Sequence, residues 1–226
     1  MGTTGDVATR WPMKLRQLLL LSPLLVISAG FIVAHFSARL FGVWAWIPLS
    51  LVYWSVLALL IAAGGGVKAM RQRLVPLRGR YWGWAVLGMA VGLLPLPVLL
   101  TKGAVLQRMG VWLPWLLFAL VNPWLEESYW RGVLSDATAS WKRWPSVLYS
   151  SALFAISHPL MWGVFSAANR TVTVVAATFL MGVAWSWIYL KTRSLRWPLL
   201  SHAVVDLLNL SVPVFMNLYV PSGKWW

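Results

Sequence analysis

Residues 116–134 read LLFALVNPWLEESYWRGVL, in which two adjacent glutamates, Glu126 and Glu127, interrupt a long apolar run. Arg131 follows Glu127 by four residues, and the whole chain has only five aspartate and glutamate residues. An ionisable side chain at membrane depth is costly, and such a residue commonly marks a functional site. This stretch therefore predicts a membrane-spanning helix that carries a reactive site.

The composition indicates an integral membrane protein. Hydrophobic residues make up 60% of the chain, charged residues make up 11%, and the mean hydropathy is +0.71. Apolar runs of about 20 residues recur, and each is long enough to cross a hydrocarbon core of roughly 30 Å. These runs are continuous, whereas the strands of a transmembrane barrel alternate. We therefore expect an all-α fold, a polytopic transmembrane helical bundle that forms a single domain over 1–226.

About seven membrane spans are expected, within a range of roughly six to eight. Their approximate limits are 17–38, 44–66, 81–101, 110–134, 145–162, 172–190 and 197–219. Thirteen lysine and arginine residues fall in loops on the N-terminal side of the membrane and five on the other, with Arg131 counted inside a span. Basic loops stay in the cytoplasm, so this asymmetry predicts a cytoplasmic N-terminus and an external C-terminus. The first apolar stretch exceeds the roughly 7–15 residues of a secretory signal core, which predicts a retained first span.

Charge and cysteine content narrow the functional classes. The net charge is +14, but the basic residues are scattered in short loops, which favours membrane topology and anionic-lipid contact over nucleic acid binding. The chain contains no cysteine, so disulfides, thiol nucleophiles and thiolate metal ligands are excluded. The expected surroundings are a lipid bilayer, with no nucleic acid partner.

Two later spans carry further polar residues at depth. His158 ends the segment Phe154-Ala-Ile-Ser-His158, and His202 opens the segment His202-Ala-Val-Val-Asp206, with Asn209 three residues further on. Positions i, i+4 and i+7 of a helix share one face. His202, Asp206 and Asn209 are therefore expected to point the same way, as are Phe154 and His158.

The two glutamates are expected to have different roles. Glu127 and Arg131 stand at i and i+4 and can pair, which offsets part of the cost of burying each charge. Glu126 is rotated by about 100° from its neighbour on an α-helix, so it is expected to point elsewhere and to be the reactive acid. His35, outside these segments, is expected to be an ordinary packing residue.

Glu126, His158 and His202 fall at intermediate depths, where tilted helices can bring them to one site. Carboxylates and imidazoles placed together can perform general acid–base chemistry on a water molecule. Other hydrolase patterns do not occur: the chain has no His-Glu-x-x-His zinc helix and no Gly-x-Ser-x-Gly elbow. Asp206 is the only aspartate expected within a span, so a pair of intramembrane aspartates is also excluded.

The remaining pattern resembles the CPBP family, the CAAX proteases and bacteriocin-processing enzymes, also called the Abi family. Its three motifs occur here in order, as Glu126-Glu127-Ser-Tyr-Trp-Arg131, Phe154-Ala-Ile-Ser-His158 and His202-Ala-Val-Val-Asp206. The resemblance covers about 110–210, and the pattern is similar to that of type II CAAX prenyl endopeptidases. It implies an intramembrane endopeptidase with catalytic helices in 106–219 and supporting helices in 1–105.

The resemblance also implies roles for the motif residues. Glu126 and His158 would activate the attacking water, while His202 and residue 206 would stabilise the oxyanion of the tetrahedral intermediate. Glu127 and Arg131 would hold their helix in register, with Phe154 as a supporting residue. The prenyl-protein proteases carry asparagine where this chain has Asp206. Asp206 is then expected either to donate as a protonated acid, to orient His202 or to ligate a metal, with Asn209 as a substitute donor.

A metal-free mechanism is favoured, so no cofactor and no metal ligands are assigned. Zinc is the alternative, since Glu, His, His and Asp are adequate zinc ligands. The rival functions are a proton-coupled transporter, because buried carboxylates and histidines also form proton relays, and a non-catalytic membrane scaffold. The expected substrate is a membrane-associated protein or peptide, either prenylated or with a C-terminal transmembrane tail. The expected location is a bacterial inner membrane, crossed several times.

Overall fold

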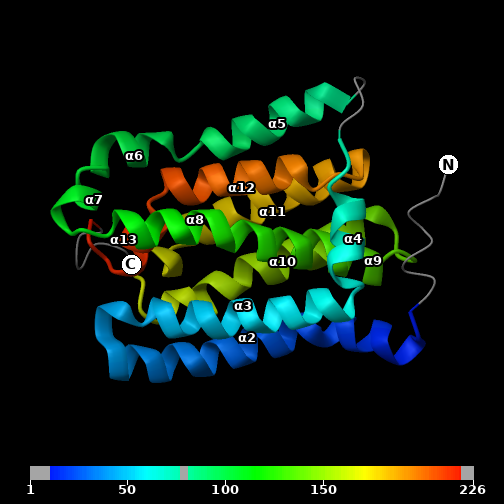
Figure 1. Ribbon diagram of the computed structural model, residues 1–226, viewed down its shortest axis with the longest axis horizontal. Helices are drawn as coiled ribbons and strands as arrows, with labels where there is room; N and C mark the ends of the chain where they lie inside the picture. The colour runs from blue at the N-terminus through cyan, green and yellow to red at the C-terminus, as the bar shows by residue number, and fades with distance from the viewer. Residues whose placement is uncertain (1–10, 77–80, 220–226) are drawn as a thin grey trace.

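The longest helices run side by side along one axis of the molecule (Figure 1). The computed structural model describes residues 11–76 and 81–219, and every regular element in these ranges is a helix. The long helices are α2 (Met13–Phe41), α3 (Trp46–Ala63), α5 (Trp82–Leu93), α8 (Trp112–Glu126), α10 (Arg143–Leu160), α11 (Val172–Thr192) and α12 (Arg196–Leu208). The expected all-α fold is confirmed for the described part of the chain.

Short elements join and extend these helices. They are η1 (Gly42–Trp44), α4 (Gly66–Arg73), α6 (Leu96–Lys102), α7 (Val105–Arg108), the π-helix η3 (Glu127–Val133), α9 (Leu134–Ala137), η4 (Trp162–Val164), η5 (Ala168–Arg170) and α13 (Ser211–Phe215). The polypeptide direction alternates from one long helix to the next (Figure 1). Consecutive helices therefore return to opposite ends of the bundle, as membrane-crossing segments do.

Five helical segments within the described residues are long and apolar enough to cross a membrane. They are Met13–Trp44, Trp46–Ala63, Trp82–Lys102, Arg143–Val164 and Val172–Thr192. The other two expected spans, 110–134 and 197–219, fall on helices that are divided: α8 continues into η3 and α9, and α12 is followed by α13. The count of seven spans thus stays a prediction. These two divided segments carry the carboxylates and His202 of the expected site.

A backbone turn separates α12 from α13. Leu210 adopts a left-handed conformation with φ 57°, which costs an L-residue roughly 1–2 kcal/mol. Its side chain is fully buried, so packing holds the turn in place. After it, α13 packs against α8, and the Phe215 ring stacks on Trp162 with centroids 4.6 Å apart. The turn thereby places α13 across the end of the bundle, beside the site described below.

The helices α5 and α6 form one edge of the bundle (Figure 1). Pro95 lies between them and α5 rests on α12. A Cβ atom on Gly92 of α5 would lie only 3.0 Å from the carbonyl oxygen of Ser201 on α12, so glycine permits this close approach. The Ser201 hydroxyl donates a hydrogen bond to the Gly88 carbonyl at 2.6 Å, which fixes α5 against α12.

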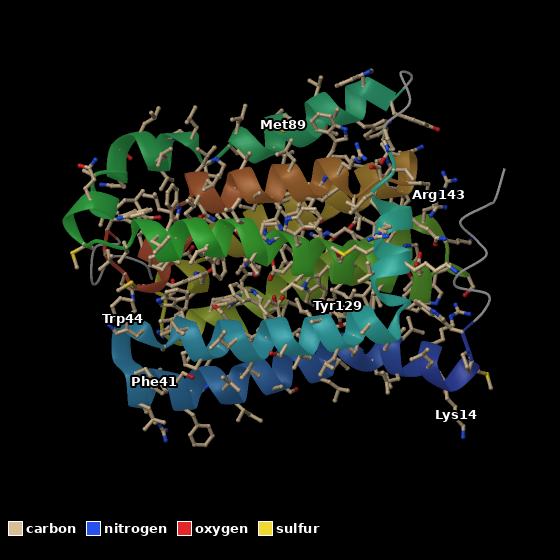
Figure 2. The ribbon with its side chains drawn as sticks, in the orientation of Figure 1. Lys14, Phe41, Trp44, Met89, Tyr129 and Arg143 are labelled. Atoms are coloured by element: carbon tan, nitrogen blue, oxygen red, sulfur yellow. The ribbon has the colours of Figure 1, made fainter. Side chains whose placement is uncertain are left out.

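The two ends of the bundle differ in charge. Lys14 and Arg143 lie at the end that α4 crosses, whereas Phe41 and Trp44 lie at the opposite end (Figure 2). At the first end Arg73 of α4 pairs with Asp136 of α9 at 2.5 Å. These two ends are called below the α4 end and the α13 end.

Candidate active site

Both glutamates contact the same histidine ring. Glu126 is the last residue of α8 and Glu127 the first of η3. Glu127 Oε1 lies 2.8 Å from His202 Nδ1, and Glu126 Oε2 lies 3.4 Å from His202 Nε2. The two carboxylates thus meet opposite nitrogens of one imidazole ring, and Glu126 takes no part in the Glu127–Arg131 ion pair.

Glu126 is buried among hydrogen-bond donors. The Tyr53 hydroxyl donates to its Oε1 at 2.7 Å, and the Asn122 amide donates to its Oε2 at 3.1 Å. Tyr53 in turn accepts a hydrogen bond from the indole of Trp130 at 3.0 Å. Only 2% of Glu126 is exposed. These partners orient the carboxylate and provide hydrogen bonds to both of its oxygens.

Glu127 forms the ion pair expected from its spacing. Arg131 Nη1 donates to Glu127 Oε1 at 3.1 Å, and both side chains are fully buried. The Arg131 guanidinium lies 4.2 Å from the ring centroid of Phe154 and 5.2 Å from that of Trp185. Cation–π contact with two rings compensates a desolvated guanidinium in part. Pairing of Glu127 with Arg131 is confirmed, and the carboxylate has a second task in holding His202.

The ring of His202 is held on its face as well as at both nitrogens. Trp185 stacks on it with centroids 4.6 Å apart and an interplanar angle of 17°. The Trp185 indole donates to the Ser201 hydroxyl at 2.9 Å, which fixes the tryptophan itself. Because Glu127 contacts Nδ1, the opposite nitrogen, Nε2, is the one that faces Glu126 and Asp206.

His158 has a defined hydrogen-bond arrangement. Its Nδ1 lies 2.9 Å from the backbone carbonyl oxygen of Phe154. A carbonyl can only accept, so Nδ1 carries the proton, and Nε2 of a neutral ring keeps a lone pair. The Phe154 ring packs edge-on against His158 at 4.9 Å. Phe154 thus supports the site through both its carbonyl and its ring.

Asp206 contacts the cluster without making the hydrogen bond that orients His202. Its Oδ2 lies 3.8 Å from His202 Nε2 and accepts from the Asn122 amide at 3.3 Å. His202 Nδ1 instead donates its hydrogen bond to Glu127 Oε1, at 2.8 Å. The Asn122 amide therefore links Glu126 and Asp206 by donating a hydrogen bond to each carboxylate.

The candidate catalytic residues share one cavity. A space of about 200 Å³ is lined by Glu126, His158, His202 and Asp206 together with Asn122 and Asn209. Asn209 makes no hydrogen bond through its side chain, and its Oδ1 atom is buried without a partner. The expected convergence of these side chains is therefore found in the structure, while their catalytic roles remain predictions.

A larger, mostly apolar cavity joins the first one. It has a volume of about 550 Å³ and shares His158, His202, Asp206 and Asn209 with its neighbour. The apolar part of its wall comes from α5, α6, the turn between them and α11. It includes Val91, Leu94, Ala177, Leu180 and Met181. A segment of apolar polypeptide can therefore lie beside Glu126, His158, His202 and Asp206, which are called below the polar cluster.

The zinc alternative was tested against the arrangement of these side chains. In the parts of the chain that are described, no three histidine, aspartate or glutamate residues are placed to share one metal ion. Both ring nitrogens of His202 face carboxylates, with Glu127 at Nδ1 and Glu126 at Nε2. Within the described residues, these side chains as arranged do not present three ligands to one zinc ion.

Sequence reasoning missed several residues of the site. Tyr53 belongs to α3, within the part expected only to support the catalytic helices, and Trp185 lies on α11 between two motifs. Asn122 lies on α8, four residues before Glu126 and outside the three motifs. Tyr53 and Asn122 could have been found from the sequence, because each is a polar residue within an otherwise apolar span. Such polar groups need hydrogen-bond partners at membrane depth.

Comparison with known proteins supports the resemblance of the motifs. Residues 108–208, a little under half of the chain, match a family model described as type II CAAX prenyl endopeptidase, Rce1-like. No curated protein and no solved structure matches the chain. The matched segment contains the Glu-Glu-x-x-x-Arg, Phe-x-x-x-His and His-x-x-x-Asp motifs, whose side chains meet at one cavity. Through these residues the segment 108–208 is similar to type II CAAX prenyl endopeptidases, in agreement with the resemblance of its motifs to the CPBP family.

Proposed function

We propose that this protein hydrolyses a peptide bond of a membrane-associated protein or peptide, using a water molecule activated by Glu126 and His158. The observation that supports this most is the shared cavity, lined by a buried carboxylate and by a histidine whose Nε2 is free to accept. A carboxylate and an imidazole beside one space can hold a water molecule and take its proton.

The mechanism follows from the partners of each side chain. Glu126 removes a proton from the water as the hydroxide adds to the scissile carbonyl carbon, and the protonated Glu126 then donates to the leaving amine. His158 Nε2 accepts the second hydrogen of the water and orients it. As an imidazolium, His202 donates from Nε2 to the developing oxyanion while Glu127 accepts from Nδ1. Asn209, with its unpaired amide, and a protonated Asp206 are further donors for that oxygen.

The wider proposal concerns substrate and location. Members of this family act on membrane-associated, prenylated proteins, and a prenylated tail or a C-terminal transmembrane tail is the substrate class that we propose. We propose that the protein crosses a bacterial inner membrane seven times. In this proposal residues 1–105 support the catalytic helices of 106–219. The direct test is trapping: the Glu126→Gln protein is crosslinked in its native membranes, and the retained polypeptides are identified by mass spectrometry.

Chelation separates the metal-free mechanism from the zinc alternative. We expect that hydrolysis by the purified protein is unchanged after incubation with a chelator, because Glu126 and His158 activate the water without a Lewis acid. Elemental analysis of the same sample should find less than one zinc ion per chain. Activity that is abolished by the chelator and restored by zinc would establish the zinc alternative instead.

Cysteine accessibility tests the expected topology. The chain contains no cysteine, so Lys142→Cys and Arg39→Cys each introduce one reactive thiol, at the α4 end and at the α13 end. Because basic loops stay in the cytoplasm, a membrane-impermeant thiol reagent added to intact cells should modify position 39 and spare position 142. Modification of position 142 from outside would reverse the orientation.

A further inference from the structure

Both cavities at the candidate active site extend toward the α13 end of the bundle. The first is lined beyond the polar cluster by Val98, Ala168, Asn169, Ser211 and Tyr219. The second continues along α6 and the first half of α11. No residue that lines either cavity belongs to α4 or α9, which lie at the opposite end (Figure 1). The polar cluster is thus connected to one end of the molecule.

Packing closes the route from the cluster to the α4 end. Arg131 fills the space next to Glu127 on that side and is fully buried between Phe154 and Trp185. A Cβ atom on Gly182 of α11 would lie 3.2 Å from Arg131 Nη2. The Arg131 side chain is therefore packed closely against the backbone of α11 as well as against two aromatic rings.

A second layer of contacts lies closer to the α4 end. A Cβ atom on Gly132 would lie 3.2 Å from the Arg73 side chain, so α4 is pressed onto the π-helix. Arg73 pairs with Asp136, and its carbonyl accepts a hydrogen bond from the Leu195 amide at 2.8 Å. Through these contacts α4, α9 and the turn before α12 pack together at the α4 end of the bundle, next to the π-helix that carries Arg131.

Charge identifies the membrane side of each end. Described basic residues gather at the α4 end, where they are Lys14, Arg16, Lys68, Arg71, Arg73, Lys142, Arg143, Lys191, Arg193 and Arg196. The described basic residues of the α13 end are Arg39, Lys102, Arg108 and Arg170. By the positive-inside rule the α4 end faces the cytoplasm. The closed side of the active site is then cytoplasmic, and the open side is external.

We infer that the substrate enters from the non-cytoplasmic side and is a membrane-anchored polypeptide whose cleavage site lies at the external end of its apolar segment. The inference rests on the proposed function, and it narrows the substrate class to polypeptides that have already been inserted or exported. The larger cavity receives the apolar segment, because its walls on α5, α6 and α11 are apolar and it meets the first cavity at His158 and His202. A peptide tail confined to the cytoplasm would not reach Glu126.

Single-cysteine labelling tests the side of entry without depending on hydrolysis. Ala168→Cys places a thiol in the wall of the first cavity, with Arg39→Cys and Lys142→Cys as reporters of the two faces. The probe is a methanethiosulfonate with a permanently charged ammonium group, applied to right-side-out and inside-out vesicles. We expect position 168 to react at least about tenfold faster in right-side-out vesicles, because the charged reagent does not cross the hydrocarbon core.

Each other outcome contradicts the inference. Faster reaction of position 168 in inside-out vesicles would place the opening in the cytoplasm. No reaction of position 168 on either side, while positions 39 and 142 react normally, would show that the cavity is closed to the exterior. Either result leaves the proposed hydrolysis standing, since that proposal is tested separately by the loss of activity in Glu126→Gln.

Discussion

Replacing Glu126 by glutamine is expected to lower turnover by roughly 10²–10⁴-fold, the contribution of a general base. Glutamine keeps the shape of the side chain and can still accept from the Tyr53 hydroxyl, which now donates to Glu126 at 2.7 Å. The amide cannot take a proton from water, so folding is retained and the chemical step is lost. The measurement is the turnover number for a membrane substrate in liposomes, together with the thermal unfolding of the same sample.

Two histidines provide a matched control for the loss of activity. His35 and His158 each have Nδ1 at 2.9 Å from the carbonyl of a phenylalanine four residues earlier. His35 is exposed and lines neither cavity, whereas His158 lines both. We expect His158→Gln to lower turnover strongly and His35→Gln to leave it unchanged. Full activity of Glu126→Gln, or equal effects of the two histidine variants, would contradict the assignment of the water-activating pair.

The same two histidines show what a short motif can predict. Phe31-Ile-Val-Ala-His35 fits the pattern Phe-x-x-x-His as well as Phe154-Ala-Ile-Ser-His158 does. In both segments the phenylalanine ring contacts the histidine ring, with centroids 4.1 Å and 4.9 Å apart. The local pattern therefore specifies a helical turn and no chemistry. Only the combination with Glu126 and His202 on other helices distinguishes the functional copy.

The helical fold was predictable because its signal is local. An apolar run that must satisfy every backbone group in lipid can only form a helix, and each of the seven expected spans falls on helical residues. The breaks inside 81–101 and 197–219 were harder to place. Pro95 marks the first in the sequence, but the second rests on Leu210, an ordinary apolar residue whose left-handed conformation depends on the packing around it.

The internal arrangement of the site was less predictable for a similar reason. The backbone hydrogen bonds of a π-helix span five residues, whereas those of an α-helix span four. The spacing of residues in the sequence does not reveal the π-helix η3. The contact of both Glu126 and Glu127 with the His202 ring likewise depends on the position of another helix. The contact between Tyr53 and Glu126 joins residues 73 positions apart, and no local pattern marks such a pair. The motifs thus predicted which side chains meet, while their hydrogen bonds came from tertiary packing.

Replacing Glu127 by glutamine is expected to lower the free energy of unfolding by about 3–5 kcal/mol, the usual effect of breaking a buried ion pair. Arg131 would lose its only carboxylate while two further guanidinium nitrogens, Nε and Nη2, already lack partners. Arg131→Met removes the charge and leaves an apolar side chain between Phe154 and Trp185. The double variant should therefore be more stable than the sum of the single changes indicates, by about 0.5–3 kcal/mol for residues in direct contact.

Asp136→Asn is the matched control for Glu127→Gln, because it breaks the ion pair between Arg73 and the partly exposed Asp136 at a site that lines neither cavity. It should lower stability while each folded molecule keeps its turnover. Glu127→Gln should lower both, since the ionised carboxylate also holds Nδ1 of His202 at 2.8 Å. The measurements are unfolding in detergent followed by tryptophan fluorescence and turnover per folded molecule. Unchanged stability in Glu127→Gln, or strict additivity in the double variant, would show that the pair does not stabilise the fold.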